Sequence, residues 1–500
     1  MKTAGAGAAA AGMAGMAGKN LLGQMFPPGV QAAKKPPPEP GIPINNAIII
    51  GGGIAGLTAA SLLTDLGKPV TVIESCHRPG GRLQTTYFPN GQHAVAAGME
   101  WYTCDYDFEW LVKTYLGFPS KDIFTLGDNT FFWWKGQYCF CSGGWGSGCV
   151  TDCLPLADPE KYWDYETESK KFYDCIVTEE PLDLPEVCWL GSKKEPWDIT
   201  NYYDYMTAKY DETMADHFGN VCFPSELGVA PNLASESLGQ YCMAYWYWDN
   251  AYCLKQGNYA IVEALMSRIP AGSVKLNEQA TSVTTTPTGV QVVSNKGTYT
   301  ADIAIVAVPH TVVADIVPEL PSERAGINDM MMNPKALVAD LQFTERFWLD
   351  LGMNGWGGYI DYPEGGSCCV SDETAMQTGT EGILSIYINE PQSLPLWPSN
   401  LKGIHVTGSD KTNVVDHCLA KLDEIWPATQ YYNGNAKVYA WQPYVPVYPP
   451  RFVRDGHYTK LRQPIPDVNL GPIWFAADYP YGPGLTSAVH LAMDVVDKFE

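Results

Sequence analysis

The stretch AIIIGGGIAGLTAASLLTDLGKPVTVIESCHRPGGR, residues 47–82, decides the fold of this chain. The apolar run at 47–51 predicts a buried strand that ends in glycine. Helical periodicity follows over 54–66 and stops at a glycine, and PVTVIE at 69–74 predicts a second strand. The stretch is therefore expected to form a β-α-β unit with parallel strands.

Three glycines lie between the first strand and the helix. Gly51, Gly53 and Gly56 fit the pattern G-x-G-x-x-G. The first glycine permits a tight turn, the second lets the backbone approach a pyrophosphate, and the third lets the helix pack on the strand. The N–H groups at the helix start, from Ile54 and Ala55, would then face the phosphates. The pattern predicts a dinucleotide site.

Glu74 ends the second strand, 18 residues after Gly56. An acidic side chain at that place is suited to a ribose hydroxyl. A glutamate disfavours a 2′-phosphate, so NADP is not expected. From these residues alone, FAD and NAD both fit.

The next segment, RPGGR at 78–82, favours FAD through a resemblance. The pattern Glu-x-x-x-R-x-G-G-R after a β-α-β unit resembles the flavin-containing amine oxidase superfamily, which includes monoamine, polyamine and L-amino-acid oxidases. Further segments resemble that family in the expected order: AAGMEWY (96–102), KQGNYAIVEAL (255–265), ADIAIVAVP (301–309), LQFTERFW (341–348) and FAADYPYGPGLTSAVHLA (475–492).

The resemblance implies an α/β chain, α+β overall, with a Rossmann-like FAD-binding domain of the glutathione-reductase-like type. A second, substrate-binding domain would contain a mixed sheet and helices. The FAD-binding domain is expected to be discontinuous, from residues 45–103, 255–320 and 437–500, and the substrate domain to take 104–254 and 321–436. The aromatic-rich stretch 105–252 shows little strand alternation, and much of it is expected to be helical or irregular.

The resemblance also assigns non-covalent FAD and its contacts. Glu74 would bind the adenosine ribose, Arg82 would lie by the pyrophosphate and flavin, and Asp478 would hold the ribityl or phosphate end. Covalent members carry cysteine where this chain has Val447. The full set of expected FAD contacts is Gly51, Gly53, Ile54, Ala55, Gly56, Glu74, Gly80, Gly81, Arg82, Gly98, Met99, Glu100, Ala280, Trp441, Asp478, Leu485 and Thr486.

The catalytic positions depart from the family pattern. Many members place a lysine nine residues before the Phe of the Phe-Trp pair, but here that position is Val338, and Lys335 is the nearest lysine. The family's two substrate-flanking tyrosines correspond to Tyr448 and to Tyr481, the latter one residue away from the usual place. Glu100 stands near where L-amino-acid oxidases carry an arginine for the substrate carboxylate, so a cationic or aromatic amine is expected as substrate.

The implied reaction is hydride transfer from the carbon beside an amine nitrogen to flavin N5, with dioxygen as oxidant and hydrogen peroxide as product. Two alternatives remain open at this point. One is an FAD-dependent desaturase or dehydrogenase of the same fold that acts on a non-amine, and the other is a flavin-binding protein with a regulatory role.

Composition limits the partners. The 500 residues contain 55 acidic and 32 basic side chains, a formal net charge of −23, so neither nucleic acid nor an anionic membrane is an expected partner. No apolar run is long enough for a transmembrane helix. The oligomeric state cannot be deduced from the sequence.

The cysteines and the N-terminal segment bear on the compartment. The 14 cysteines form no C-x-x-C pair, so no metal site is expected, and free buried thiols are favoured over disulfides. No N-x-[ST] sequon occurs. Residues 1–44 are Ala/Gly/Met-rich and then proline-rich, which indicates a disordered or targeting tail. A cytoplasmic or organellar location is favoured over secretion.

Overall fold

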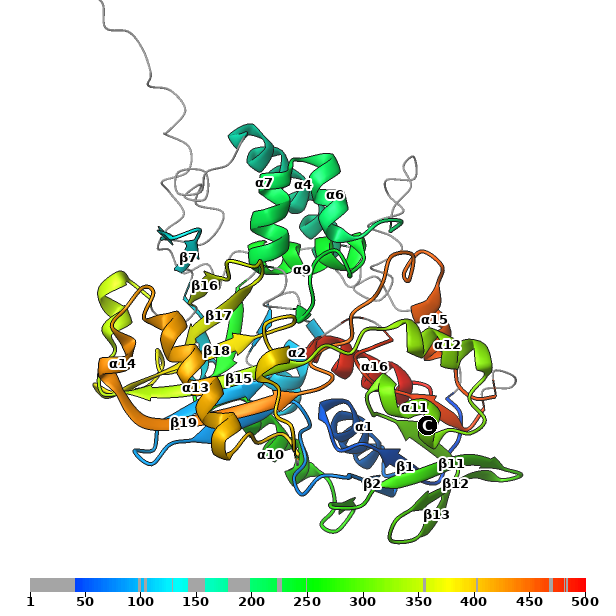
Figure 1. The fold of residues 1–500 in the computed structure, drawn as a ribbon. Helices are drawn as coiled ribbons and strands as arrows, with labels where there is room; N and C mark the ends of the chain where they lie inside the picture. Colours follow the sequence, from blue (N-terminus) through cyan, green and yellow to red (C-terminus); the bar gives the residue numbers. More distant parts are fainter. Residues whose placement is uncertain are drawn as a thin grey trace, which may run out of the picture. The chain divides into compact units, whose positions relative to one another are not determined.

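The computed structural model describes residues 41–97, 100–102, 106–127, 129–142, 158–178, 198–222, 227–248, 250–353, 357–401, 403–466, 471–480, 482 and 484–500 (Figure 1). The chain divides into two compact units, residues 1–42 and 43–500. Only residues 41 and 42 of the first unit are described, so every described helix belongs to the second. Most of the expected N-terminal tail, residues 1–40, lies outside the described residues.

A five-stranded parallel sheet is formed by segments from three separate parts of the chain. Its order is β10-β2-β1-β14-β20, and all four pairings are parallel. The strands are β1 (Ala47–Ile50), β2 (Val70–Ile73), β10 (Val274–Lys275), β14 (Ile303–Val306) and β20 (Ile473–Phe475). β1 and β14 are buried at every residue, as a parallel sheet covered on both faces requires.

Helices from both ends of unit 43–500 pack beside this sheet. α1 (Ile54–Asp65) contacts α16 (Leu485–Val496) and α10 (Tyr259–Arg268). In Figure 1 the blue α1 and the red α16 come from opposite ends of the coloured chain. Beside this sheet lie β11 (Ala280–Thr286), β12 (Gly289–Ser294) and β13 (Thr298–Ala301), an antiparallel sheet, together with α11 (His310–Ile316) and α12 (Ser322–Met330). The expected β-α-β unit is present.

A seven-stranded mixed sheet has the order β19-β15-β18-β17-β16-β7-β8. Its strands are β7 (Thr130–Trp134), β8 (Gln137–Cys141), β15 (Ala336–Phe343), β16 (Gly358–Asp361), β17 (Ser367–Asp372), β18 (Gly382–Ile388) and β19 (Tyr432–Trp441). Residues 437–441, which the sequence analysis assigned to the FAD-binding domain, therefore belong to a strand of this second sheet. Only β16 and β7 are parallel neighbours.

The two faces of this sheet meet different partners. Along β15 the side chains of Leu337, Ala339 and Leu341 join a core that includes α13 (Gly408–Leu422). Val338 points to the opposite face and joins the core that also contains residues of β1 and β14. Because successive strand side chains alternate between faces, Asp340 and Gln342 lie on the Val338 face.

The remaining elements are short or helical. The helices are α2 (Tyr106–Glu109), α4 (Pro159–Thr178), α6 (Tyr202–Lys209), α7 (Glu212–Met214), α9 (Glu236–Trp248), α14 (Ala428–Tyr431) and α15 (His457–Arg462), with π-helical η1 (Trp110–Tyr115) and η5 (Ala215–Cys222) and 3₁₀ turns η2 (Ser120–Asp122), η6 (Phe347–Leu351) and η7 (Leu394–Leu396). The strands are β3 (Gln84–Tyr87) with β4 (His93–Ala97), and β5 (Trp101–Tyr102), β9 (Ala251–Leu254) and β6 (Ile123–Thr125). The helix and sheet content confirms the α/β class.

Much of the stretch 105–252 was expected to be helical or irregular, and its described residues contain several helices but also strands that the sequence pattern did not indicate. The FFWW run forms most of β7, and β8 pairs with it. Four of the five β7 residues are buried, so no polar residue alternates with the apolar ones and the period of two is absent from the sequence. None of the described helices is both long and apolar enough to span a membrane.

The expectation of free cysteines holds for some positions and fails for others. Cys76, Cys253, Cys368 and Cys418 carry free thiols. Cys139 and Cys141, both on β8, are disulfide-bonded, which corrects the expectation at these two positions. Disulfides persist in oxidising compartments, so these two cysteines count against a reducing location.

Asp198 joins three segments that are distant in sequence. Its Oδ1 accepts hydrogen bonds from Ser235 (2.5 Å) and Ser237 (2.7 Å), and its Oδ2 accepts the backbone N–H groups of Val453 and Arg454 (3.0 Å each). The residue is fully buried. It therefore fixes the start of α9 against the segment that precedes α15.

We expect Asp198→Ala to lower the free energy of unfolding by about 3 kcal/mol, because four donors, three of them in buried hydrogen bonds, lose their acceptor. Chemical denaturation measures the change. The control is Asp204→Ala, which removes an exposed aspartate whose side chain accepts one hydrogen bond, from Asn201. A loss no larger than that of the control, which we expect to stay within about 0.5 kcal/mol, would contradict this role for Asp198.

Candidate functional site

A cavity of about 1200 Å³ lies between the parallel sheet and the seven-stranded sheet. One part is lined by the carboxyl ends of β1 and β2 and the start of α1, the place where open α/β sheets bind nucleotides. Another part is lined by residues of β17, β18, β19 and α9. The volume exceeds that of typical small-ligand pockets, which leaves room for a dinucleotide and a second molecule.

The glycine turn is shaped for a close backbone approach. Gly51 has φ +104°, and a Cβ there would come within 2.3 Å of the Ala307 carbonyl oxygen. A Cβ on Gly56 would come within 2.0 Å of the Gly51 carbonyl oxygen, so this glycine serves packing and is not on the cavity wall. Gly53 lines the cavity, and a Cβ there would meet nothing within 4 Å. No side chain caps α1 at Gly53, so its first N–H groups are available to an anion.

Glu74 lies at the end of β2, on the cavity wall as expected. Its Oε2 accepts the N–H of Gly52 (2.6 Å), and its Oε1 accepts the N–H of Cys76 (2.7 Å). These two bonds orient the carboxylate, and its remaining lone pairs can accept ribose hydroxyls. Ala280 also lines the cavity.

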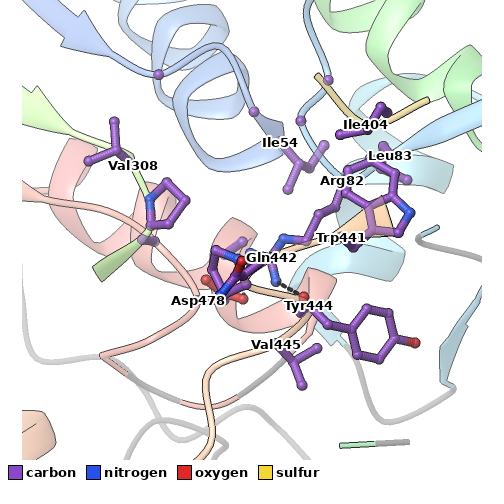
Figure 2. A pocket seen from close by; sticks show the side chains of 18 of the residues that line it. Ile54, Arg82, Leu83, Val308, Ile404, Trp441, Gln442, Tyr444, Val445 and Asp478 are labelled. Atoms are coloured by element: carbon purple, nitrogen blue, oxygen red, sulfur yellow. Dashed lines mark hydrogen bonds and ion pairs between the residues drawn. The ribbon is translucent and has the colours of Figure 1, made fainter. Parts of the chain in front are cut away.

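Arg82 and Asp478 connect the first and last parts of the expected FAD site. Arg82 Nη2 lies 2.6 Å from Asp478 Oδ2, and Arg82 Nη1 donates to the Tyr444 carbonyl (3.0 Å). Figure 2 shows Arg82 extending toward Asp478 and Tyr444, with Trp441 beside it. The side chain of Asp478 is nearly buried while that of Arg82 is about one-third exposed, at 5% and 32%. Arg82 therefore keeps a surface that an anionic ligand can contact.

The start of α16 forms another end of the cavity. Leu485 and Thr486 line the wall, and the N-cap, Gly484, offers no side-chain cap. The buried Thr486 Oγ1 has no hydrogen-bond partner among the described residues. Buried polar atoms are normally paired, so this orphaned hydroxyl fits a polar ligand atom. Together, the open glycine turn, Glu74, Arg82 and this helix start fit the two ends of an FAD.

The remaining expected FAD contacts are placed as follows. Ile54, Ala55, Gly80, Gly81, Glu100 and Trp441 line the cavity. Gly98 and Met99 lie outside the described residues.

The expected catalytic residues separate into three groups. Glu100 lines the cavity, and its Oε1 accepts the hydroxyl of Tyr102 (2.6 Å). Tyr481 lies outside the described residues. Tyr448 and Lys335 are described but are not on the cavity wall.

Tyr448 has a structural environment. It is 2% exposed, its hydroxyl donates to the Tyr479 carbonyl (2.7 Å), and its ring stacks on Phe452 at 4.5 Å. The expectation that it flanks the substrate is therefore not met. The sequence match placed Tyr448 in the segment where the family carries a substrate-flanking tyrosine. The spacing between Trp441 and Tyr448, however, is shorter than the spacing in the family.

Lys335 precedes β15 rather than lying on it. Its Nζ is 5.3 Å from the centroid of the Trp397 ring, and its backbone N–H donates to Glu390. Val338 stands where the family places its lysine. Its side chain is fully buried in the core that also contains residues of β1 and β14. An ammonium group from Lys335 is therefore not placed on the cavity wall.

Other aromatic residues line the cavity in place of the expected pair. Tyr387 and Tyr444 both lie on the wall, with ring centroids 6.3 Å apart and planes inclined by 56°. Tyr387 is the register partner of Val338. Every residue of β18 is buried, so no alternation in the sequence indicates which of its side chains face the cavity. The other wall residues that the sequence analysis missed include Cys242, Cys369, Trp397 and His405.

A family model described as flavin containing amine oxidoreductase matches residues 54–485. Polyamine oxidase 4 of Oryza sativa subsp. japonica is 26% identical over 321 residues, 63% of this chain and 62% of that protein. Amine oxidase [flavin-containing] A of Canis lupus familiaris is 25% identical over 332 residues, 61% of this chain and 57% of that protein. The chain thus spans less than two thirds of the length of these curated relatives.

Solved structures share the fold over nearly the whole chain. Cyclohexylamine oxidase from Brevibacterium oxydans superposes with a TM-score of 0.68 at 17% identity, covering 91% of this chain and 100% of that one. Putrescine oxidase bound to putrescine gives a TM-score of 0.68 at 17% identity, covering 90% and 98%. At this identity the likeness establishes the fold.

Proposed function

Since the chain belongs to the flavin-containing amine oxidoreductase family, we propose that it oxidises a cationic amine with FAD as cofactor. Bound FAD would accept at N5 the hydride from the carbon beside the amine nitrogen, and dioxygen would take up the two electrons and become hydrogen peroxide. Water would hydrolyse the resulting imine to a carbonyl compound and ammonia. The residues of this chain bind the cofactor, place the amine and exclude water.

The observation that carries the proposal is Glu100 on a cavity wall that also carries aromatic side chains. Its carboxylate is oriented by Tyr102 at 2.6 Å. Tyr387, Tyr444 and Trp441 contribute rings to the same cavity. A carboxylate attracts an ammonium ion, and aromatic faces add cation–π attraction.

A single nitrogen cannot use both environments fully. The reacting amine must lose its proton, and a water-poor aromatic wall favours that neutral form. A charged group beside Glu100 would keep its proton. A diamine satisfies both conditions, with the reacting nitrogen between the rings and the distal ammonium at Glu100. The relatives named polyamine oxidase and putrescine oxidase support this substrate class.

The relatives do not favour the alternative of a desaturase that acts on a non-amine. Val338 in place of the family's lysine remains a departure, and the described residues of the cavity wall include no lysine. We propose that the amine is instead deprotonated by solvent before it enters.

The test is anaerobic reduction of the FAD that purifies with the protein, followed by absorbance. We expect putrescine to reduce the flavin and L-amino acids to fail, because Glu100 repels a substrate carboxylate. In air, putrescine should release hydrogen peroxide. If no amine reduces the flavin while a polyene does, the proposed function is wrong.

A further inference from the structure

The helix α16, whose first turn forms one end of the cavity, carries a buried histidine. Thr486 in that first turn lines the cavity wall, and His490 follows it by four residues. Side chains four apart lie on the same face of a helix, with Cβ atoms about 5–6 Å apart. Helical side chains also lean toward the N-terminus of their helix, so the imidazole of His490 covers the turn that contains Thr486.

An acidic side chain from a second helix contacts this imidazole. Asp107 lies on α2, which packs against α16, and its Oδ2 is hydrogen-bonded to His490 Nδ1. The side chain of His490 is 7% exposed and that of Asp107 is 31% exposed, so the carboxylate keeps contact with solvent while the imidazole has little. An ionised carboxylate only accepts hydrogen bonds. Nδ1 therefore carries the proton that the pair shares, and Nε2 is the atom that can gain a second proton.

The other charged groups around α16 have partners of their own. Its packing partners are α1, α2 and β20, and β20 has only apolar side chains. The acids on these elements, on α16 and between β20 and α16 each form an ion pair with a basic side chain: Asp65 with Arg268, Glu109 with Lys113, Asp494 with Lys498 and Asp478 with Arg82. The remaining titratable group is the phenol of Tyr106 on α2. Asp107 is therefore the carboxylate that acts most directly on His490.

The start of α16 is suited to the flavin end of the cofactor. Glu74 and the start of α1 fit the adenosine ribose and the pyrophosphate, which leaves the turn of Thr486 for the flavin. A hydride carries two electrons and one proton, so hydride transfer adds one negative charge to FAD. His490 is not on the cavity wall, so it would respond to that charge through space, across the turn of Thr486.

We propose that His490 is a positioning residue for the reduced cofactor: its Nε2 binds a proton from solvent when FAD accepts a hydride, and Asp107 holds the imidazole at the turn of Thr486. The new N–H bond forms at His490, and no further oxidant or reductant takes part. The summed charge of FAD and His490 is then the same before and after reduction. A cation placed beside the new negative charge stabilises the reduced state.

The resulting pH dependence has a definite sign. Histidine is the side chain that changes charge near neutral pH. A nearby negative charge favours the protonated imidazole, so His490 keeps its proton to higher pH in the reduced protein than in the oxidised protein. Within that interval, reduction takes up an extra proton, and the midpoint potential of FAD falls more steeply as the pH rises. Below the interval His490 is protonated in both states, and above it in neither.

The experiment measures the midpoint potential of the FAD-bound protein between about pH 5.5 and about pH 8.5, with dithionite as reductant. We expect the wild-type potential to fall by about 30 mV more over this range than that of His490→Gln, which corresponds to about tenfold tighter proton binding at His490 after reduction. Glutamine keeps a donor for Asp107 but does not titrate. Asp107→Asn should move the extra fall to lower pH, because an amide does not favour the protonated imidazole.

The matched control is His417→Gln. His417 lies on α13, which joins the core on the other face of the seven-stranded sheet, and its Nε2 is hydrogen-bonded to the Tyr362 hydroxyl (3.0 Å). It is not on the cavity wall. This control removes a histidine that titrates away from α16, so its potential should follow that of the wild type.

The outcomes decide the role of His490 independently of the substrate. A His490→Gln potential that falls as steeply as the wild-type potential overturns the proposal, and so does an equal change in His417→Gln. If His490→Gln does not retain FAD, nitrogen-15 NMR of the wild-type imidazoles decides: the histidine hydrogen-bonded to a carboxylate must gain a proton on reduction near neutral pH, and its absence refutes the proposal. No amine is used, so a failure of the proposed amine oxidation would leave these results unchanged.

Discussion

Glu100→Gln is expected to lower kcat/KM for putrescine by about 30- to 100-fold, which corresponds to about 2–3 kcal/mol of lost transition-state binding. Glutamine keeps the size of the side chain and can still accept the Tyr102 hydroxyl, which is 2.6 Å away. It removes the charge that, under the proposed function, would hold an ammonium group in the cavity. Because the distal ammonium is bound in both the ground state and the transition state, most of the loss should appear in KM.

The matched control is Glu323→Gln, which removes one negative charge from an exposed ion pair with Lys460. With a net charge of −23, the whole chain attracts cations, and this control measures that general contribution. A second comparison uses a monoamine that lacks the distal ammonium, for which Glu100→Gln should have a smaller effect. Equal losses for the diamine and the monoamine would show that Glu100 does not bind the distal group.

Gly51→Ala is expected to reduce the free energy of unfolding by about 3 kcal/mol and to abolish copurification of FAD. Gly51 has φ +104°, which alanine rarely adopts. The added Cβ would also lie 2.3 Å from the Ala307 carbonyl oxygen. That oxygen belongs to the backbone after β14. Relief of the clash therefore requires β1 and β14 to move apart.

Variants of two other glycines separate the steric clash of Gly51→Ala from the conformational cost of its positive φ. Gly67, at φ +74° after α1, would place its Cβ in open space, so Gly67→Ala measures the conformational cost alone, about 1 kcal/mol. Gly53→Ala meets nothing within 4 Å, so it should leave stability almost unchanged while weakening FAD binding, because its Cβ would occupy the cavity. Chemical denaturation measures the change in stability, and the absorbance of bound flavin measures the change in FAD binding. A Gly51→Ala protein as stable as Gly67→Ala would contradict the steric argument.

The cofactor end of the site could be predicted because its constraints are local. A backbone with positive φ, a close approach to a neighbouring strand and a carboxylate at the end of β2 each require a particular residue type at a fixed separation. The sequence therefore indicates the cofactor site through Gly51, Gly53 and Glu74. The structure places all three on the cavity wall. The parallel strands could be predicted for the same reason, because short apolar runs bounded by glycine or proline indicate them.

The substrate end depended on pairings that the sequence does not contain. β15 and β18 are buried at every residue, so the sequence pattern did not show which side chains face the cavity. Only the register of the two strands puts Tyr387 beside Val338. Tyr448, which matched by residue type, lies in the core instead.

The sequence by itself determined the α/β class, the dinucleotide turn and the presence of Glu100, because each depends on residues close together in the chain. Only the tertiary structure decided which aromatic rings face the cavity and which buried polar residues, such as Asp340 and Ser385, lie opposite one another on neighbouring strands. The physical reason is that strand register and burial arise from contacts between distant segments, and a strand that is buried on both faces shows no alternation of buried and exposed positions to mark its faces.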